Sequence, residues 1–242
     1  MQTYEIGAII LLAAAVHASF GLSVSMLTLM SGHALGKRTA SKRVLRQSGA
    51  FSLGVITMIM LVTSLLALLV ANLFPAGIPL IAWSAVCGLM LGVGIAIWVF
   101  YYRPRQKGTV LWLPRSLARY LSSRSRATKD PAEAFGLGLA SVAAELLFTI
   151  ASMLLTALLL VSLEPPLQII GLVVYALVAS LPLIIITMLV GAGHSLGKIQ
   201  RWREQNKRFL QFAAGSALII IGGAIYVDVI LANTISTIGA AQ

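Results

Sequence analysis

The stretch FGLGLASVAAELLFTIASMLLTALLLVS, residues 135–162, decides the fold class. Its one ionisable side chain is Glu145, and the apolar run exceeds the roughly 20 residues that an α-helix needs to cross a bilayer. A helix that is apolar on nearly every side suits lipid rather than water. The stretch therefore predicts a transmembrane helix with a carboxylate near its middle.

Five more apolar runs flank this stretch, at about 4–32, 50–74, 77–101, 167–191 and 210–232. The whole chain is 59% hydrophobic and only 10% charged, whereas soluble domains carry about 25% charged residues. We therefore expect an all-α, polytopic membrane protein with six transmembrane helices embedded in a lipid bilayer. This composition excludes a soluble enzyme, and no motif indicates a membrane-bound one.

The basic residues predict the orientation in the membrane. All 18 Lys and Arg fall in the windows 37–46, 103–129 and 198–208, which follow the first, third and fifth apolar runs. The other two connections, 74–79 and 163–166, are short and contain Pro. Because cytoplasmic loops carry the excess of Lys and Arg, we expect these windows in the cytoplasm and both termini outside, in a bacterial-type inner membrane. The same clustering argues against nucleic-acid binding, despite the net charge of +11.

The connection between the third and fourth runs is long enough to have structure of its own. Apolar residues recur in it at helical spacing, with arginines between them: Val110, Leu113, Leu117 and Leu121, with Arg115 and Arg119. This pattern predicts either an amphipathic helix lying on anionic lipid at the cytoplasmic leaflet or an ordinary ordered linker. The sequence favours neither.

Two ionisable side chains, His17 and Glu145, are expected near the middle of spans. Ionisable residues at that depth cost about 2.5–3.5 kcal/mol on the translocon scale and mark functional sites by default. In the first and fourth runs, polar or small residues recur with the same spacing and stay within an arc of roughly 80° on a helix. These residues are His17, Gly21, Ser25, Thr28 and Gly32 in the first run, and Ser141, Glu145, Thr149, Ser152 and Thr156 in the fourth.

Helix packing is the simpler explanation for part of this pattern. Small and hydroxyl residues let membrane helices approach closely, which is sufficient for Gly21, Ser25 and Thr28. Packing does not require a carboxylate, so we predict that Glu145 lies on a substrate or ion pathway together with His17. The full candidate pathway is His17, Ser25, Thr28, Ser141, Glu145, Thr149, Ser152 and Pro182.

Pro182 belongs to this list because it lies inside the fifth run, where it removes a backbone hydrogen bond. Interrupted helices near the midplane line many transporter sites, although Pro also occurs there as a simple kink.

The chain divides into a three-span half at 1–101, a basic linker at 102–134 and a second half at 135–242. Because two three-span repeats must face opposite ways, we expect inverted repeats with the site between them.

A short motif occurs twice at the expected cytoplasmic face. SGHALGK at 31–37 and AGHSLGK at 192–198 agree at five of seven positions. Gly, His and Lys are favourable at helix C-termini, and we prefer this capping explanation. The functional alternative is a cytoplasmic gate or metal-sensing site formed by His33 and His194.

Two stretches carry a resemblance to a known family. SVSMLTLMSGHALGKRTASKRVLRQSGAFSLGV (23–55) has a helix ending in a Gly-containing turn, a basic loop and a helix opening with Phe-x-x-Gly. VYALVASLPLIIITMLVGAGHSLGKIQRWREQNKRFLQFAAGSALIIIGG (174–223) has a helix with a central Pro, a basic loop and a final helix rich in Gly and Ile. Together they cover about a third of the chain. The chain thus resembles the six-span lysine-exporter superfamily, nearest to its CcdA and DsbD-type proteins of thiol–disulfide transfer and cytochrome c biogenesis.

The chain departs from that branch at its cysteines. The CcdA type passes electrons through a cysteine pair in the first and fourth spans, whereas this chain has only Cys87, in the third run. Thiol–disulfide exchange needs two sulfurs, so the resemblance implies the wider superfamily's export of small solutes or ions. We expect a transporter coupled to a proton or cation gradient, without a cofactor or metal. The alternative is a redox-inactive membrane subunit or assembly factor that binds another membrane protein.

Overall fold

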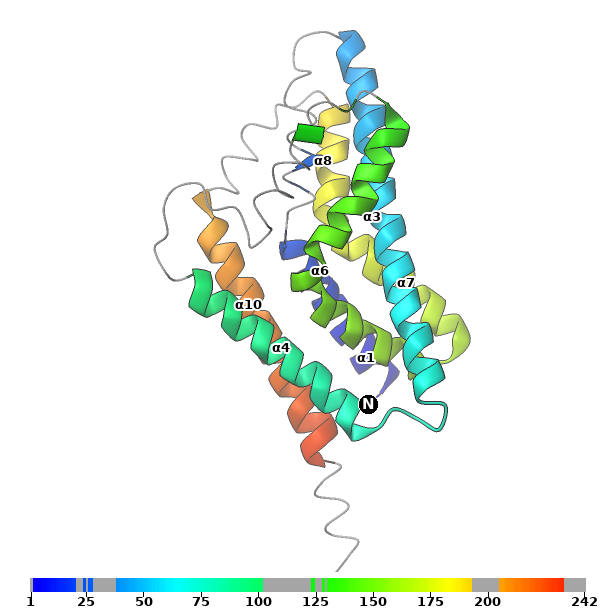
Figure 1. Cartoon of the computed structure of the whole chain (residues 1–242), viewed down its shortest axis with the longest axis vertical. Coiled ribbons are helices and arrows are strands. Elements are labelled where there is room, and N and C mark those ends of the chain that lie inside the picture. Colours follow the sequence, from blue (N-terminus) through cyan, green and yellow to red (C-terminus); the bar gives the residue numbers. More distant parts are fainter. Residues whose placement is uncertain are drawn as a thin grey trace, which may run out of the picture.

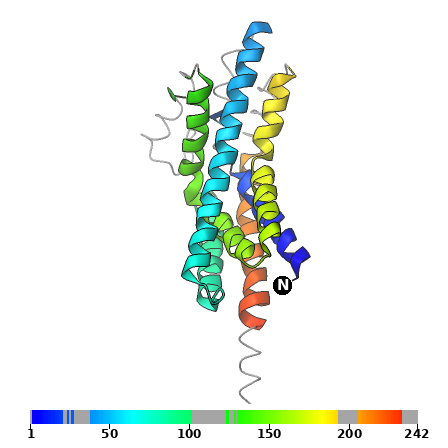
Figure 2. The ribbon, with the colours of Figure 1, turned by 90° about the vertical axis from the view of Figure 1, so that its right-hand side faces the viewer.

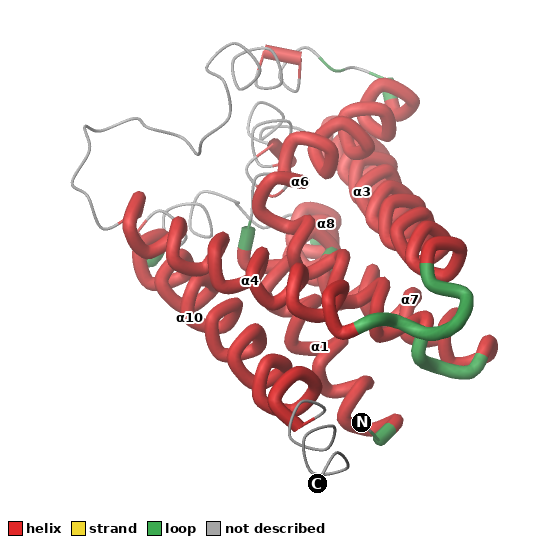
Figure 3. Tube along the Cα trace, turned by 60° about the horizontal axis from the view of Figure 1, so that its bottom comes forward, coloured by secondary structure: helices red, strands yellow, loops and turns green. Residues whose placement is uncertain are grey.

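The computed structural model describes most of the chain: residues 2–20, 24, 26–27, 38–101, 123–124, 128, 130–192 and 205–232. Regular structure in these ranges is entirely helical, as Figure 3 shows. The elements are α1 (Thr3–Ser19), α3 (Arg38–Leu73), α4 (Leu80–Tyr101), α6 (Pro131–Val161), α7 (Pro165–Ala179), α8 (Leu181–Gly191), α10 (Lys207–Ile225) and the π-helical η1 (Tyr226–Leu231). The predicted all-α fold class is confirmed for this part of the chain.

Four of these helices, α3, α4, α6 and α10 with η1, are long and apolar enough to cross a membrane. The bent pair α7–α8 makes a fifth such element if it is taken as one span. Helix α1 has 17 residues and covers only the first part of the predicted 4–32 run. The remainder of that run lies mostly outside the described residues. Within its described residues the structure thus has four or five helices able to span a bilayer, where the sequence predicts six.

Helix starts and turns follow from local sequence. Pro131 begins α6 and Pro165 begins α7, positions where the missing N–H of Pro is harmless and its fixed φ suits the first turn. The turn between α3 and α4 contains Gly77 with φ 114, a conformation open to Gly because it lacks a Cβ. The α3–α4 and α6–α7 connections, which both contain Pro, are as short as the sequence indicates.

Two helices are interrupted inside the apolar sequence. Helix α1 ends at Ser19, and Phe20 leaves the helical region with ψ 64 while its N–H bonds to the His17 carbonyl. The predicted continuous helix over 4–32 is therefore wrong at this point, and the following Gly21 favours a break because Gly costs about 1 kcal/mol in a helix. Helices α7 and α8 meet at Ser180 with a bend of 56°. Pro182 explains that bend, because it has no N–H for the helical bond.

The main helix contacts join the two halves of the chain. Helix α3 packs on α6, α4 on α10 and α1 on α7, and the views in Figures 1 and 2 show these pairs running side by side. Backbones approach closely where glycines face each other: Gly54 and Gly138 meet between α3 and α6, and Gly94 and Gly215 between α4 and α10. Gly94 of the third run and Gly215 of the sixth thus serve packing within the chain.

The described helix ends sort into two groups along the long axis of the molecule. The start of α3, the start of α6 and the end of α8, all next to basic windows, lie toward the upper end in Figure 1. The start of α1, the α3–α4 turn and the end of η1 lie toward the lower end. These three helix ends, which adjoin basic windows, thus lie toward one end of the bundle, and the short α3–α4 turn lies toward the other, whereas the end of α4 lies at about mid-height.

Candidate functional site

The polar stripe of α6 faces the inside of the bundle. Ser141, Thr149, Ser152 and Thr156 are fully buried, and Glu145 is only 6% exposed. Three of the hydroxyls bond back to carbonyls of their own helix: Ser141 to Gly138 at 2.7 Å, Thr149 to Glu145 at 3.3 Å and Thr156 to Ser152 at 2.8 Å. Such bonds satisfy a hydroxyl in an apolar interior and also bend helices. Figures 1 and 2 show α6 bending in its middle.

His17 is joined to the second half of the chain by a buried hydrogen bond. Its Nδ1 lies 2.8 Å from the hydroxyl oxygen of Tyr175, and both side chains are buried, in α1 and α7 respectively. The side chain of Thr156 on α6 also hydrogen-bonds to the Tyr175 hydroxyl. A continuous polar chain thus runs from the imidazole through Tyr175 to Thr156 and on to the Ser152 carbonyl, linking three helices.

The direction of this chain can be reversed without moving heavy atoms. The Tyr175 hydroxyl donates either to Thr156, which then donates to the Ser152 carbonyl, or to a deprotonated Nδ1 of His17. In the second arrangement the Thr156 hydroxyl turns away from the Ser152 carbonyl and donates to Tyr175. In the first arrangement the Nδ1–H of His17 donates to Tyr175. Hydroxyl and imidazole groups both accept and donate, so the chain can pass on a change in the protonation of His17.

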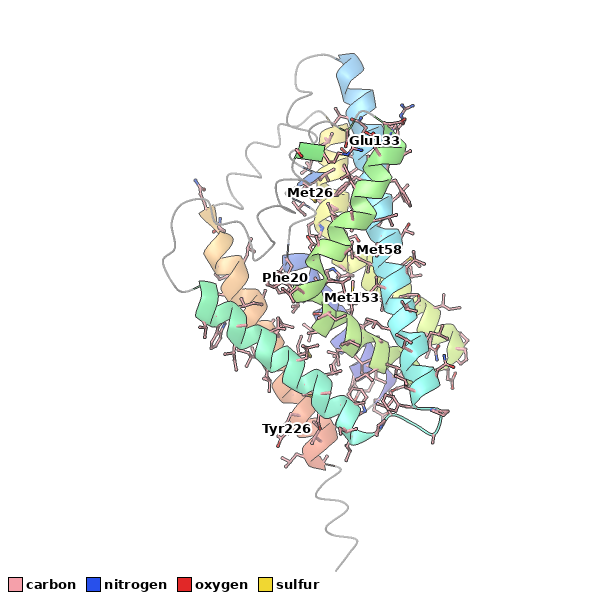
Figure 4. All side chains as sticks on the ribbon, in the orientation of Figure 1. Phe20, Met26, Met58, Glu133, Met153 and Tyr226 are labelled. Atoms are coloured by element: carbon pink, nitrogen blue, oxygen red, sulfur yellow. The ribbon has the colours of Figure 1, made fainter. Side chains whose placement is uncertain are left out.

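A stacked aromatic pair places the end of α1 against the middle of α6. The rings of Phe20 and Phe148 are 5.9 Å apart, with planes inclined by 21°, and Figure 4 shows Phe20 beside α6 at mid-height. Phe148 is three residues from Glu145, and Phe20 is three residues from His17. The structure therefore brings the His17 and Glu145 segments into one region between the halves of the chain.

Three buried hydroxyls of the described residues have no hydrogen-bond partner there: those of Thr63, Ser152 and Ser180. An unsatisfied buried polar group costs about 1–3 kcal/mol, so each is a candidate ligand atom. The candidate pathway predicted from the sequence includes Ser152 but not Ser180, a polar residue of the fifth run two positions before Pro182, and not Thr63. A signal existed for Thr63, because Ser48, Ser52 and Thr63 recur on one buried face of α3.

The other predicted site residues have mixed outcomes. Pro182 is the second residue of α8 and is partly exposed. It therefore affects the site by breaking the helix and not by lining the buried polar region. Ser25, Thr28, His33 and His194 lie outside the described residues, and the predicted amphipathic helix lies largely outside them too. Within the described part of the chain, no three His, Cys, Asp or Glu residues come together as a metal site would require. Cys87 is buried in α4.

Replacing Tyr175 with Phe removes the central hydroxyl of the polar chain. We expect a loss of stability of about 1–3 kcal/mol, because both His17 and Thr156 lose a buried partner. Thermal unfolding of the purified protein in detergent measures the loss, and Tyr4→Phe is the control, since Tyr4 is 76% exposed. Equal stability of the two variants would show that the chain contributes nothing.

The described site is a buried polar region between two interrupted helices and a bent one. No family model, curated protein or solved structure matches the chain. Its function is therefore inferred from this geometry, together with the resemblance in the two quoted stretches.

Proposed function

We propose that this protein is a secondary transporter that exports a small solute or ion and is driven by a proton or cation gradient. The observation that carries the proposal is the meeting of two interrupted helices, α1 and α7–α8, with the buried Glu145 stripe of α6. Transporters bind substrates and coupling ions near the midplane, at discontinuous helices and buried ionisable groups. A structural role alone does not require a carboxylate inside an apolar bundle.

Each group of buried residues has its own role in this proposal, which follows from its chemistry. Glu145 binds a proton or a cation, because a carboxylate in an apolar bundle is stabilised by neutralising its charge. The chain from His17 through Tyr175 to Thr156 connects the first half to α6 and reports the protonation of His17. The Phe20–Phe148 stack places two apolar rings between α1 and α6 next to these polar residues. Movement of one half against the other would open this seam alternately to each side of the membrane.

The packing pattern supports an inverted repeat of the two halves. If the two halves are related by symmetry, the first, second and third runs take the places of the fourth, fifth and sixth. The contact between α3 (second run) and α6 (fourth run) then corresponds to a contact between α7–α8 (fifth run) and α1 (first run). The α1–α10 contact likewise corresponds to α6–α4, while α4–α10 corresponds to itself, and all of these contacts are present. A pseudo-two-fold axis in the membrane plane has this consequence. The two halves differ locally, because α1 ends at Ser19 whereas α6 continues.

The proposed orientation places the basic windows in the cytoplasm and both termini outside, in a bacterial-type inner membrane. Three described helix ends support it, since the start of α3, the start of α6 and the end of α8 adjoin basic windows and lie toward the same end of the bundle in Figure 1. In this orientation the basic 102–134 linker faces anionic lipid. The resemblance to the lysine-exporter superfamily makes a small solute or ion the expected substrate class.

Reconstitution into liposomes tests the proposal. With lysine as the first radiolabelled probe and single inorganic ions as the next, an imposed pH or Na⁺ gradient should drive accumulation that an ionophore abolishes. Vesicles without the protein set the background. The transporter proposal is wrong if no gradient moves any of these probes while the protein co-purifies stoichiometrically with another membrane protein. That result would identify the assembly-factor alternative.

A further inference from the structure

The stacked rings of Phe20 and Phe148 lie between two polar parts of the bundle. Helix α1 runs upward from the lower end in Figure 1, whereas α6 runs downward from the upper end, so the two helices are antiparallel. From the stack, His17 lies three residues back along α1 and Thr156 lies eight residues further along α6. Both steps lead toward the lower end, in agreement with the hydrogen bonds that join these two side chains through Tyr175.

Glu145 lies on the other side of the stack. It precedes Phe148 by three residues, which is about 4.5 Å along α6 toward the upper end. The chain that follows Phe20 also runs toward that end, since Met26 lies above Phe20 in Figure 4. By the same count His17 lies about 4.5 Å from the stack along α1, toward the lower end. The carboxylate and the imidazole are therefore at different levels of the bundle, with the aromatic pair between them.

The stack also lies beside the polar stripe of α6. At about 100° per residue, Phe148 is about 60° from Glu145 and about 40° from Ser152 around the helix. Both Phe20 and Phe148 are only 9% exposed, and their rings stack at 5.9 Å. Apolar constrictions exclude water and close ion pathways by dewetting. The ring pair thus interrupts the hydroxyl-lined face of α6 between Glu145 and Ser152.

The backbone holds the two rings differently. Phe148 lies in the interior of α6, where the preceding turn of the helix excludes one of the three χ1 rotamers. Phe20 is the first residue after α1 and has ψ 64, outside the helical region, so its ring is free of that restriction. We therefore expect Phe20 to be the ring that moves when the stack separates.

We propose that Phe20 and Phe148 form a gate that closes the pathway between Glu145 and His17. With the rings stacked, no continuous file of water joins the carboxylate to the imidazole, so protons do not cross the membrane without transport. Separation of the rings connects the two polar parts. The inference rests on the proposed function, in which the stripe of α6 is the pathway. A packing role alone predicts that loss of either ring changes stability but not the passage of protons.

Proton leak into liposomes tests the gate without a substrate. The full chain is reconstituted with a pH-sensitive dye inside the vesicles, and a K⁺ diffusion potential, negative inside, is imposed. Vesicles with the wild type should acidify at a rate close to that of protein-free vesicles. Phe20→Ala and Phe148→Ala should each acidify severalfold faster, because the smaller side chains let water pass. Phe148→Leu keeps most of the apolar volume and should stay near the wild-type rate.

Phe212→Ala is the matched control, because it removes one ring of the chain's stacked pair of Trp98 and Phe212, which joins α4 to α10. Phe212 is 44% exposed and lies outside the stripe of α6. Its removal should leave the proton leak at the wild-type rate. Thermal unfolding in detergent shows which variants are folded and are therefore compared.

Phe148→Tyr serves if the alanine variants do not fold, since it keeps the ring and adds a hydroxyl that binds water. It should leak more than the wild type. Wild-type leak rates in the folded stack variants, or an equal rise in Phe212→Ala, would overturn the gate. A leak in the stack variants without gradient-driven transport by the wild type refutes the transporter alone. Transport by the wild type with stack variants that do not leak refutes the gate alone.

Discussion

Glu145→Gln is expected to reduce gradient-driven transport to the level of protein-free vesicles, while the protein still folds. Gln has the shape of the carboxyl side chain and retains an oxygen that accepts hydrogen bonds, but it can neither bind a proton nor balance a cation. Glu145 is buried in the middle of α6, where an ionisable group is costly unless it serves a function. The uptake assay proposed for the wild type, run side by side on both proteins, measures the loss.

Glu133→Gln is the matched control for that experiment. Glu133 belongs to the same helix but lies exposed in its first turn, at the upper end of the molecule in Figure 4. The same chemical change there should leave transport near the wild-type rate. Glu145→Asp, which keeps the charge but shortens the side chain, should retain partial activity with an altered dependence on pH. Full activity of Glu145→Gln would remove the carboxylate from the mechanism.

The sequence predicted the helices well because lipid selects for long apolar runs. The fourth run, predicted at 135–162, corresponds to α6 at Pro131–Val161. A large difference in a boundary is at the start of α3, which begins at Arg38 rather than near residue 50. Hydrophobicity detects the part of a helix that faces lipid, and the basic segment before it continues the same helix beyond the apolar run.

The interior of the bundle was harder to predict, because lipid-facing and buried positions are equally apolar. The burial of Glu145 and of its stripe followed from polar spacing along one helix. The partner of His17 did not, because Tyr175 is 158 residues away and contact between distant helices has no signature in one sequence. The end of α1 before Phe20 has only a weak local signal, Gly21, because no Pro is near it, whereas Pro182 indicates the break between α7 and α8.

Gly138→Ala is expected to destabilise the folded protein by about 3 kcal/mol, because the added methyl group has no room. A Cβ at Gly138 would collide with the backbone carbonyl oxygen of Phe51 and would lie 3.1 Å from the Cα of Gly54. Backbone atoms cannot rotate away as side chains do, so α3 and α6 would have to separate, and overpacking of this kind costs about 1–3 kcal/mol. Thermal or denaturant-induced unfolding in detergent measures the difference.

Gly136→Ala, two residues earlier on the same helix, is expected to have the opposite effect on stability. A Cβ at Gly136 meets nothing within 4 Å among the described residues, and Ala favours a helix over Gly by about 1 kcal/mol. This variant should therefore be as stable as the wild type or more stable. The difference in sign between the two substitutions tests the packing of α3 on α6, because helix propensity alone predicts stabilisation at both positions. Stabilisation of both variants would mean that the two helices do not cross at Gly54 and Gly138, and the seam that holds Glu145 would then have to be arranged differently.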